Sequence, residues 1–198
     1  MGNRGCLHNK EQEVRRHYAR KEWLFCVLHR RDSEGKDKRR TIMDSGKYTE
    51  LFFLDEATAL AAGHRPCGYC MQHRLDEFCR RWADGNPDQV EGKPKATAKA
   101  IDLQLHEERW DADSRTKRLY SHWLSDVPNG CMILLNADET QPYLVAEHCL
   151  LTWSFEGYEN WIEKPKRKKV VVLNPPSIME TLRAGFHPNI HSSLLNCV

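Results

Sequence analysis

Apolar residues along this chain fall into short runs, most of them bounded by glycine, proline, asparagine or aspartate. Residues 23–29 and 48–54 are two such runs, and both are rich in the aromatic and aliphatic side chains typical of β-strands. Asp55 follows the second run and precedes an alanine-rich stretch that Gly63 closes. Because aspartate caps helix N-termini and glycine ends helices, the pattern predicts a strand, a short helix over 56–62 and a glycine turn.

Apolar residues three and four positions apart predict two longer helices. Leu75, Phe78 and Trp82 form one stripe, which predicts a helix ending near Trp82. A second stripe predicts a helix over 96–109. The segment between the two stripes is rich in glycine, proline and aspartate, which is typical of a boundary between structural units.

The second half of the chain carries short β-rich runs separated by turn residues, followed by a predicted short helix over 177–184. The β-rich runs lie at residues 131–135, 143–145, 149–153 and 170–173. This alternation predicts an α+β protein whose second half is mostly antiparallel β-sheet. We expect a zinc-knuckle unit over 1–83, a linker over 84–95, and a helix with a small antiparallel β unit over 96–198.

Composition places the chain among globular proteins. Its 198 residues are 40% hydrophobic and 29% charged, and no apolar run approaches the roughly 18 residues that a membrane span requires. The opening residues lack the apolar stretch of a secretory signal. We therefore expect a soluble cytoplasmic protein whose eight cysteines are reduced thiols, some of them bound to metal.

Cys67 and Cys70 form a Cys-x-x-Cys pair with a glycine between them and a predicted helix directly after. Two thiolates at this spacing converge on one cation and supply half of a tetrahedral zinc site. A redox dithiol is the alternative for such a pair, but the surroundings lack the βαβ pattern of thioredoxin-like proteins. The pair therefore predicts zinc as the cofactor.

The order of the elements around this pair resembles a known module. An aromatic run, a short Glu-Ala…Ala-Gly helix and the motif Gly63-His-Arg-Pro-Cys-Gly-Tyr-Cys70 lie within about residues 48–72. This segment is similar to the second half of the zinc-binding module of the bacterial alkylation-response (Ada) proteins. The resemblance implies that Cys67 and Cys70 are zinc ligands.

The first half of that module, a Cys-x-x-x-Cys pair about thirty residues upstream, is missing from this chain. Cys6 and His8 are two residues apart, so extended backbone would place both side chains on one side. Cys26 and His29 are three apart, which on a strand places them on opposite faces, with Cys26 packed as a buried thiol. We therefore expect Cys6 and His8 to complete the site.

The basic residues are concentrated near the N-terminus. Residues 1–47 contain 13 Lys and Arg against 7 Asp and Glu, although the whole chain carries a net charge of only +2. Such a surface suits a polyanion, and Arg65, Arg74 and Arg81 flank the cysteine pair, where they would contact phosphate. The predicted function is a zinc-binding protein that contacts nucleic acid through a basic surface around the knuckle.

Two other functions fit the same residues. One is an enzyme acting on nucleic acid or a phosphoester, either a hydrolase or an alkyl acceptor, with Cys6 or His64 as the reacting group. A second set of titratable groups, His106 with the following two glutamates, would belong to such an enzyme if the fold brought it near. The other function is a structural zinc protein that binds a protein partner.

Overall fold

The structure is a computed structural model that describes residues 1–28 and 41–196. Four α-helices lie in this part of the chain: α1 (Glu56–Ala61), α2 (Gln72–Gly85), α3 (Ala98–Arg109) and α4 (Pro176–Arg183). Short 3₁₀ turns cover Pro87–Gln89, Leu124–Asp126 and Ser192–Asn196. All four helices were predicted from the sequence, although α2 continues past Trp82 to Gly85.

A six-stranded antiparallel sheet forms most of the second half of the chain. Its strands are β6 (Tyr120–Trp123), β7 (Met132–Leu134), β8 (Tyr143–Val145), β9 (Cys149–Trp153), β10 (Tyr158–Glu163) and β11 (Lys169–Val172). They are ordered β10-β9-β8-β7-β11-β6, and every neighbouring pair is antiparallel. The predicted α+β class and antiparallel second half are confirmed, while β6 and β10 were not predicted.

Two small β-structures belong to the first part of the chain. Strands β1 (Gly2–Asn3), β2 (Leu24–Phe25) and β3 (Arg65–Pro66) form a sheet in which β1 and β2 are antiparallel and β2 and β3 are parallel. The hairpin of β4 (Trp110–Asp111) and β5 (Thr116–Lys117) directly follows α3.

The strand predicted over 48–54 is wrong, because this segment is held by isolated contacts. Gly2 and Leu51 form a single antiparallel bridge, and the Thr49 N–H donates to the Gly5 carbonyl at 3.0 Å. The strand predicted over 23–29 shrinks to the two residues of β2 within the described residues. Both segments lie beside an N-terminal stretch that is too irregular to form a continuous ladder.

One apolar core joins the helices to the large sheet. It includes Leu60 of α1, Trp82 of α2, Ile101 of α3, Ile133 of β7 and Ile178 of α4, each at most 1% exposed. The hydrophobic effect makes such fully buried side chains the main favourable contribution to the stability of the fold.

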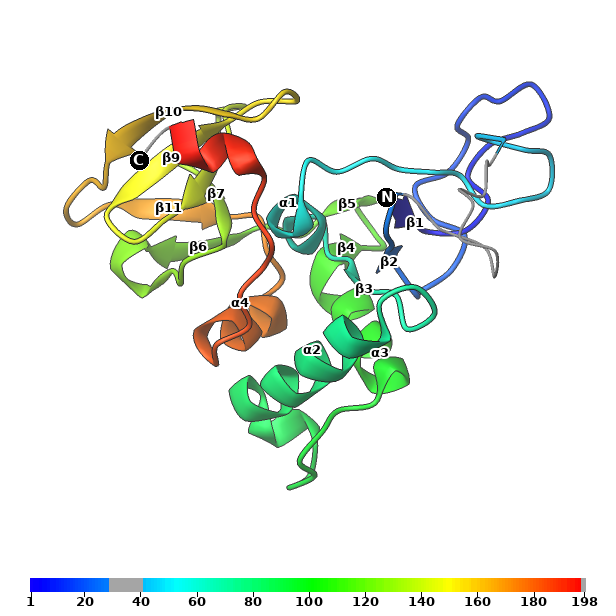
Figure 1. Ribbon diagram of the computed structural model, residues 1–198, viewed down its shortest axis with the longest axis horizontal. Coiled ribbons are helices and arrows are strands. Elements are labelled where there is room, and N and C mark those ends of the chain that lie inside the picture. Colours follow the sequence, from blue (N-terminus) through cyan, green and yellow to red (C-terminus); the bar gives the residue numbers. More distant parts are fainter. Residues whose placement is uncertain (29–40, 197–198) are drawn as a thin grey trace.

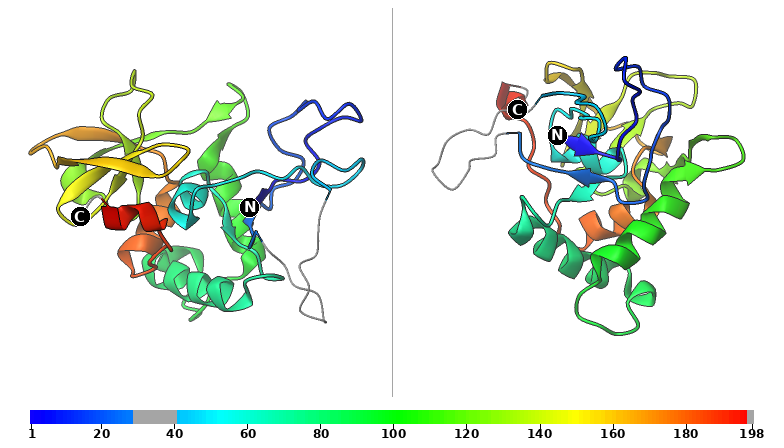
Figure 2. Two further views of the ribbon diagram at one scale, coloured as in Figure 1. Left: turned by 45° about the horizontal axis from the view of Figure 1, so that its top comes forward. Right: turned by 90° about the vertical axis from the view of Figure 1, so that its right-hand side faces the viewer.

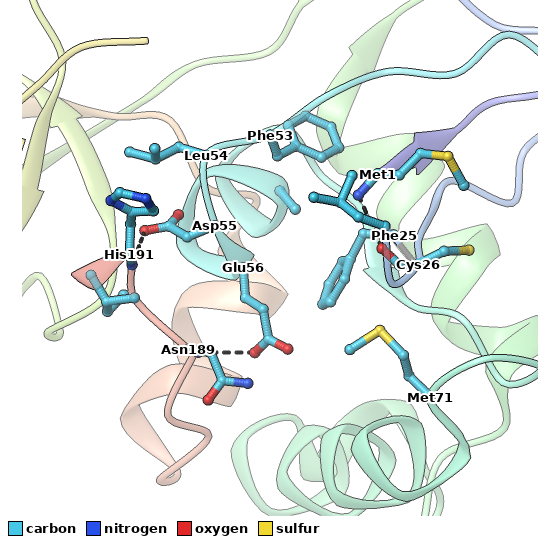
Figure 3. A pocket seen from close by; sticks show the side chains of 13 residues that line it. Met1, Phe25, Cys26, Phe53, Leu54, Asp55, Glu56, Met71, Asn189 and His191 are labelled. Atoms are coloured by element: carbon cyan, nitrogen blue, oxygen red, sulfur yellow. Dashed lines mark hydrogen bonds between the residues drawn. The ribbon is translucent and has the colours of Figure 1, made fainter. Parts of the chain in front are cut away.

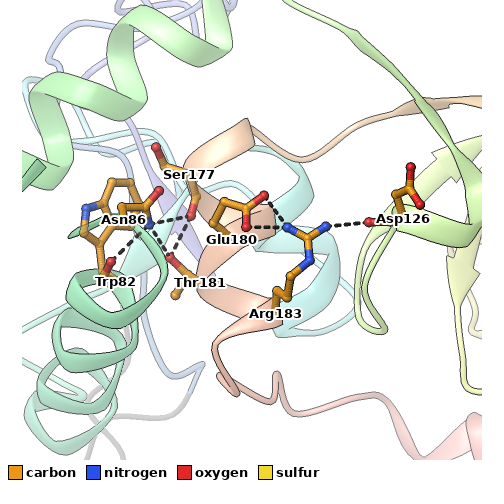
Figure 4. Close-up of polar contacts among 7 residues, drawn as sticks. All are labelled: Trp82, Asn86, Asp126, Ser177, Glu180, Thr181 and Arg183. Atoms are coloured by element: carbon orange, nitrogen blue, oxygen red, sulfur yellow. Dashed lines mark hydrogen bonds and ion pairs between the residues drawn. The ribbon is translucent and has the colours of Figure 1, made fainter. Parts of the chain in front are cut away.

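The contact between α2 and α4 is especially close. A Cβ on Gly85 would clash with the backbone carbonyl of Glu180, so only glycine fits at this position. The side-chain amide of the next residue, Asn86, donates to the Trp82 and Ser177 carbonyls, both at 3.1 Å (Figure 4). On the other side of α4, the Arg183 guanidinium donates to the Asp126 carbonyl.

Figure 1 shows the arrangement of these parts. The six-stranded sheet lies at one end, the N-terminal loops and β1 lie at the other, and α1 lies between them. Helices α2, α3 and α4 lie below this row in the same view, and the left-hand view of Figure 2 shows the same order of sheet, α1 and N-terminal loops. Among the residues described, no helix combines the length and apolar character needed to cross a membrane.

Candidate metal centre

The path of the chain toward Cys67 is set by α1. The Asp55 carboxylate accepts a hydrogen bond from the Thr58 N–H at 2.9 Å, so Asp55 caps the helix as predicted. Gly63 ends the turn with φ at +75°, and a Cβ there would lie 2.7 Å from Cδ of Arg109. This position therefore requires glycine, which lets the chain reverse directly into β3.

Strand β3 then places Cys67 beside Cys26. Its parallel pairing with β2 has Arg65 opposite Leu24 and Pro66 opposite Phe25. The Cys67 N–H donates to the Phe25 carbonyl at 2.9 Å, directly after the paired residues. Cys26 and Cys67 therefore leave two adjacent strands at the same level.

The turn after β3 brings Cys70 to the same point. The Met71 N–H donates to the Cys67 carbonyl at 2.9 Å, and α2 begins at the next residue. A Cβ on Gly68 would lie 2.9 Å from Cδ2 of Leu75, so glycine lets the turn pack closely against α2. The motif predicted from sequence is thus a tight knuckle at the start of α2.

The Sγ atoms of Cys26, Cys67 and Cys70 all lie within 4.8 Å of one another. The Sγ atoms of Cys67 and Cys70 are 3.8 Å apart. Thiolates bound at about 2.3 Å to a tetrahedral zinc lie about 3.8 Å from each other. The three side chains therefore form one face of a tetrahedron that could hold a metal ion, and the described residues offer no fourth His, Cys, Asp or Glu to this group.

The thiols already share their protons in this arrangement. The Cys26 thiol donates a hydrogen bond that lowers the pKa of Cys67, and the backbone N–H groups of Cys70 and Tyr69 lower it further, while burial opposes them. The pKa of Cys26 is raised because its proton is held by Cys67 and because the group is partly buried. The arrangement thus favours one negative charge, on the Cys67 sulfur, which a bound cation would neutralise.

Cys26, which was expected to be a buried thiol, takes the place predicted for Cys6 and His8. The strand predicted over 23–29 would include Cys26, whereas β2 ends one residue before it. Cys26 is half-buried, and Leu28, one of its predicted neighbours, is 58% exposed. His29 lies outside the described residues.

Cys6 and His8 do not belong to the cysteine group. The Cys6 thiol donates to the backbone carbonyl of His8 at 3.5 Å, and Nδ1 of His8 is 2.6 Å from Oγ1 of Thr49. The side chains are used within the N-terminal loop, because residues 6–8 do not form the extended strand that the spacing argument assumed. The prediction that they complete the site is corrected accordingly.

Two of the three arginines expected to contact phosphate are used inside the fold. Arg65 is 6% exposed, and its guanidinium donates to both carboxylate oxygens of Asp102, at 2.8 and 2.6 Å. Arg74 forms ion pairs with Glu56 and Glu77. Arg81 has a side chain that is 46% exposed and lies 3.5 Å from the Asp84 carboxylate. Of these three arginines, only Arg81 therefore remains accessible to a phosphate.

His64 is a core residue. It is completely buried, its ring lies 4.7 Å from that of Phe53, and its Nε2 accepts a hydrogen bond from Nε of Arg4 at 3.1 Å. Burial, and then the charges of Arg4 and Arg109, lower the pKa of His64 well below its usual value. A neutral, enclosed imidazole cannot act on a substrate, so the acid–base role considered for it is not supported.

The second acid–base set is also held in the fold. The Glu108 carboxylate accepts from the backbone N–H and the hydroxyl of Ser177, while the His106 ring packs edge-on against Tyr18 at 5.0 Å. Trp82 is 1% exposed in the core, whereas Tyr69 in the knuckle is 74% exposed. The structure thus brings together the three thiols rather than an acid–base constellation.

A cavity of about 280 Å³ lies beside Cys26 (Figure 3). Its wall is largely apolar and includes Phe25, Phe53 and Met71. The two acidic groups at its edge are engaged: Asp55 accepts from the Tyr158 hydroxyl at 2.7 Å, and Glu56 accepts from the Asn189 N–H at 2.9 Å. The cysteine group therefore borders an apolar space at Cys26.

No family model matches this chain, and no curated protein or solved structure does so either.

Proposed function

We propose that this chain is a zinc-binding protein that contacts nucleic acid, with Cys26, Cys67 and Cys70 as zinc ligands. The convergence of the three thiols carries the metal part of this proposal. Sulfur ligands at tetrahedral spacing suit zinc better than calcium or magnesium, which prefer oxygen. The likeness of residues 48–72 to the Ada zinc-binding module supports the same choice.

The bound ion would connect the small N-terminal sheet to α2. Cys26 follows β2, Cys67 follows β3, and Cys70 lies two residues before α2. The strands of this sheet contain only two residues each, so few backbone hydrogen bonds hold it together. A metal that joins its ends to a long helix would contribute directly to the folding free energy.

Metal analysis of the purified protein tests the site. We expect one zinc per chain, loss of zinc in Cys26→Ser and Cys67→Ser, and unchanged zinc in the control Cys149→Ser, whose half-buried thiol lies on β9. Cobalt replacement should give the charge-transfer absorption of thiolate ligands. A metal-free protein, or full zinc content in Cys26→Ser, would contradict the proposal.

The fourth ligand is identified by the same measurements. Three further variants, Cys6→Ser, His8→Ala and His29→Ala, cover the residues that the sequence argument considered for the site. We expect Cys6→Ser and His8→Ala to keep their zinc, since both residues lie outside the cysteine group. A cobalt spectrum altered only by His29→Ala would identify an imidazole ligand, and a spectrum unchanged in all three would exclude Cys6, His8 and His29 as the fourth ligand.

The nucleic-acid part of the proposal is supported by exposed basic residues in the N-terminal loop, among them Arg15, Arg16, Arg20 and Lys21. Arginine and lysine that neutralise phosphates release counterions, so the affinity falls steeply with salt. We expect binding to short DNA strands at low salt that weakens as salt is raised. Absence of binding at low salt, or a binding affinity that does not change with salt concentration, would contradict the nucleic-acid part of the proposal.

An alkyl-accepting enzyme is the second candidate, because Cys26 borders the apolar cavity. In that reaction the Cys26 sulfur would attack the alkyl carbon of an alkylated phosphate or base, forming a thioether while the bond to the donor oxygen or nitrogen breaks. Mass spectrometry after incubation with methylated DNA tests it. One added methyl group on Cys26 would favour the enzyme, and no added mass would exclude it for that donor.

A further inference from the structure

A second concave site, lined by none of the three cysteines, lies between the N-terminal loop and the β4–β5 hairpin. Its volume is about 380 Å³, within the range of about 300–1,000 Å³ typical of small-ligand sites. The residues that line it are basic or aromatic, apart from one alanine: Arg15, Arg16, His17, Tyr18, Trp110, Ala112 and Arg115. Arg15 and Arg16 belong to the exposed basic residues of the N-terminal loop, whereas the proposed zinc site uses none of the residues that line this pocket.

Ordered contacts hold the two segments in place. The Trp110 ring lies 5.0 Å from that of His17 and 5.5 Å, edge-on, from that of Tyr18. The loop backbone is fixed because the Arg15 N–H donates to the Leu7 carbonyl at 2.8 Å. On the other side, the Asp111 carboxylate accepts from two backbone N–H groups of the hairpin turn. The pocket is therefore formed before any ligand arrives.

The charge of this pocket is not neutralised by its own wall. Arg16 and Arg115 are exposed and form no ion pair with any residue in the described part of the chain, whereas Arg15 pairs with Glu13. No carboxylate lines the pocket, and the nearby Asp111 carboxylate is occupied by the turn and lies 3.7 Å from Arg118. Two free guanidinium groups beside a polar cavity are suited to a phosphate.

The aromatic rings add a second kind of recognition. Trp110 and Tyr18 are both half-buried, so each keeps some ring surface accessible at the pocket. A nucleobase stacks on such rings, and in single strands the base faces are free to do so. Base faces within a duplex are already covered by their neighbours.

We infer that this pocket binds one nucleotide of a single-stranded nucleic acid, with its phosphate against Arg16 and Arg115 and its base against Trp110. The inference rests on the proposed function, because it assigns the nucleic-acid contact to a defined surface. It also moves that contact from Arg65 and Arg74, which are paired inside the fold, to the N-terminal loop and the hairpin.

The test compares two double variants with the same change in charge. The pocket variant, Arg16→Gln with Arg115→Gln, removes the two free cations of the pocket. Position 115 has a positive φ of +56°, and glutamine adds no backbone strain there beyond that of arginine. Arg80→Gln with Lys99→Gln is the control, since both side chains are exposed, Arg80 on α2 and Lys99 on α3. Binding of fluorescein-labelled oligo-dT is measured by anisotropy across a salt series, and zinc content confirms that each variant is folded.

We expect the pocket variant to bind oligo-dT at least about tenfold more weakly than the control variant. Its plot of log K against log salt should be shallower by about 0.7, since the two arginines neutralise one phosphate and each neutralised phosphate contributes about 0.7 in single strands. Ultraviolet cross-linking of wild-type protein to the oligonucleotide should label Tyr18 or Trp110. Trp110→Leu should weaken binding without changing the salt slope, because it removes stacking and no charge.

Four outcomes distinguish the failures. Equal weakening in both double variants would overturn the pocket and leave the proposed function standing. No binding by the wild-type protein would overturn both. Pocket-dependent binding of deoxythymidine monophosphate alone, with none to the strand, would overturn the assignment to single strands. Cross-links confined to residues outside the two segments would overturn the stacking contact.

Discussion

The ion pair between Arg65 and Asp102 gives the sharpest test of the fold around the candidate metal centre. Both side chains are nearly inaccessible, with exposures of 8% and 5%, and the pair is bidentate. Removing one partner of such a buried pair leaves an uncompensated charge and costs about 3–5 kcal/mol, whereas an exposed pair contributes about 0–1 kcal/mol. We therefore expect Asp102→Asn to lower the free energy of unfolding by about 3–5 kcal/mol.

Urea unfolding followed by tryptophan fluorescence measures this loss. Asp76→Asn is the matched control, because the pair of Asp76 with Lys95 is partly exposed, with side-chain exposures of 31% and 46%. The control should change stability by less than about 1 kcal/mol. A double variant, Arg65→Met with Asp102→Leu, should recover most of the loss because it leaves no charge unpaired. An Asp102→Asn protein as stable as Asp76→Asn would refute the reasoning.

The same substitution has a consequence at the cysteines. Arg65 lies two residues before Cys67, and its N–H donates to the Trp23 carbonyl at 3.0 Å within the parallel pairing of β2 and β3. Loosening Arg65 would disturb the alignment that brings Cys26 and Cys67 together. Zinc should therefore transfer faster to a competing chelator from Asp102→Asn than from Asp76→Asn.

Three further predictions concern other parts of the molecule. His64 stays neutral in the native state, whereas it takes up a proton in the unfolded chain below about pH 6.5. The free energy of unfolding should therefore fall by at most about 1.4 kcal/mol per pH unit on acidification, and His64→Phe should remove that contribution. Gly85→Ala should destabilise the protein by about 1–3 kcal/mol in the same urea assay, because the added methyl group would clash with the Glu180 carbonyl. The control Arg81→Ala should change the free energy of unfolding by less than about 0.5 kcal/mol. Removal of zinc by a chelator should lower the melting temperature of the wild-type protein and leave that of Cys67→Ser unchanged, as calorimetry would measure.

Local signals explain why several elements could be predicted from the sequence. Asp55 and Gly63 mark the two ends of α1 by their own chemistry, and the apolar stripe of Leu75, Phe78 and Trp82 defines the buried face of α2. Strand β10 was missed because its pattern is mostly exposed, with only its first residue, Tyr158, buried. A strand at the edge of a sheet carries too weak an apolar alternation to be recognised.

The partner of the cysteine pair could not be predicted because it depends on contacts between distant segments. Cys26 joins Cys67 through the parallel pairing of two-residue strands, and neither strand is long enough to leave a periodic pattern. The partner of Arg65 lies 37 residues away on α3, so an arginine next to the motif gave no sign that it would be buried. In both cases residue type predicted the chemistry and tertiary packing decided the partner.

In the pocket between the N-terminal loop and the β4–β5 hairpin, too, residue type indicates the chemistry and tertiary packing decides which residues act together. Residues 15–18 carry two arginines followed by two aromatic rings, a sequence signal that combines phosphate and base recognition. Its significance becomes apparent only when Trp110 and Arg115 are placed against it, nearly a hundred residues later in the chain. The arginines beside the cysteines had the stronger sequence context, yet Asp102 and Glu56 neutralise two of them. Availability of charge, rather than proximity to a motif, therefore decides which surface is suited to a polyanion.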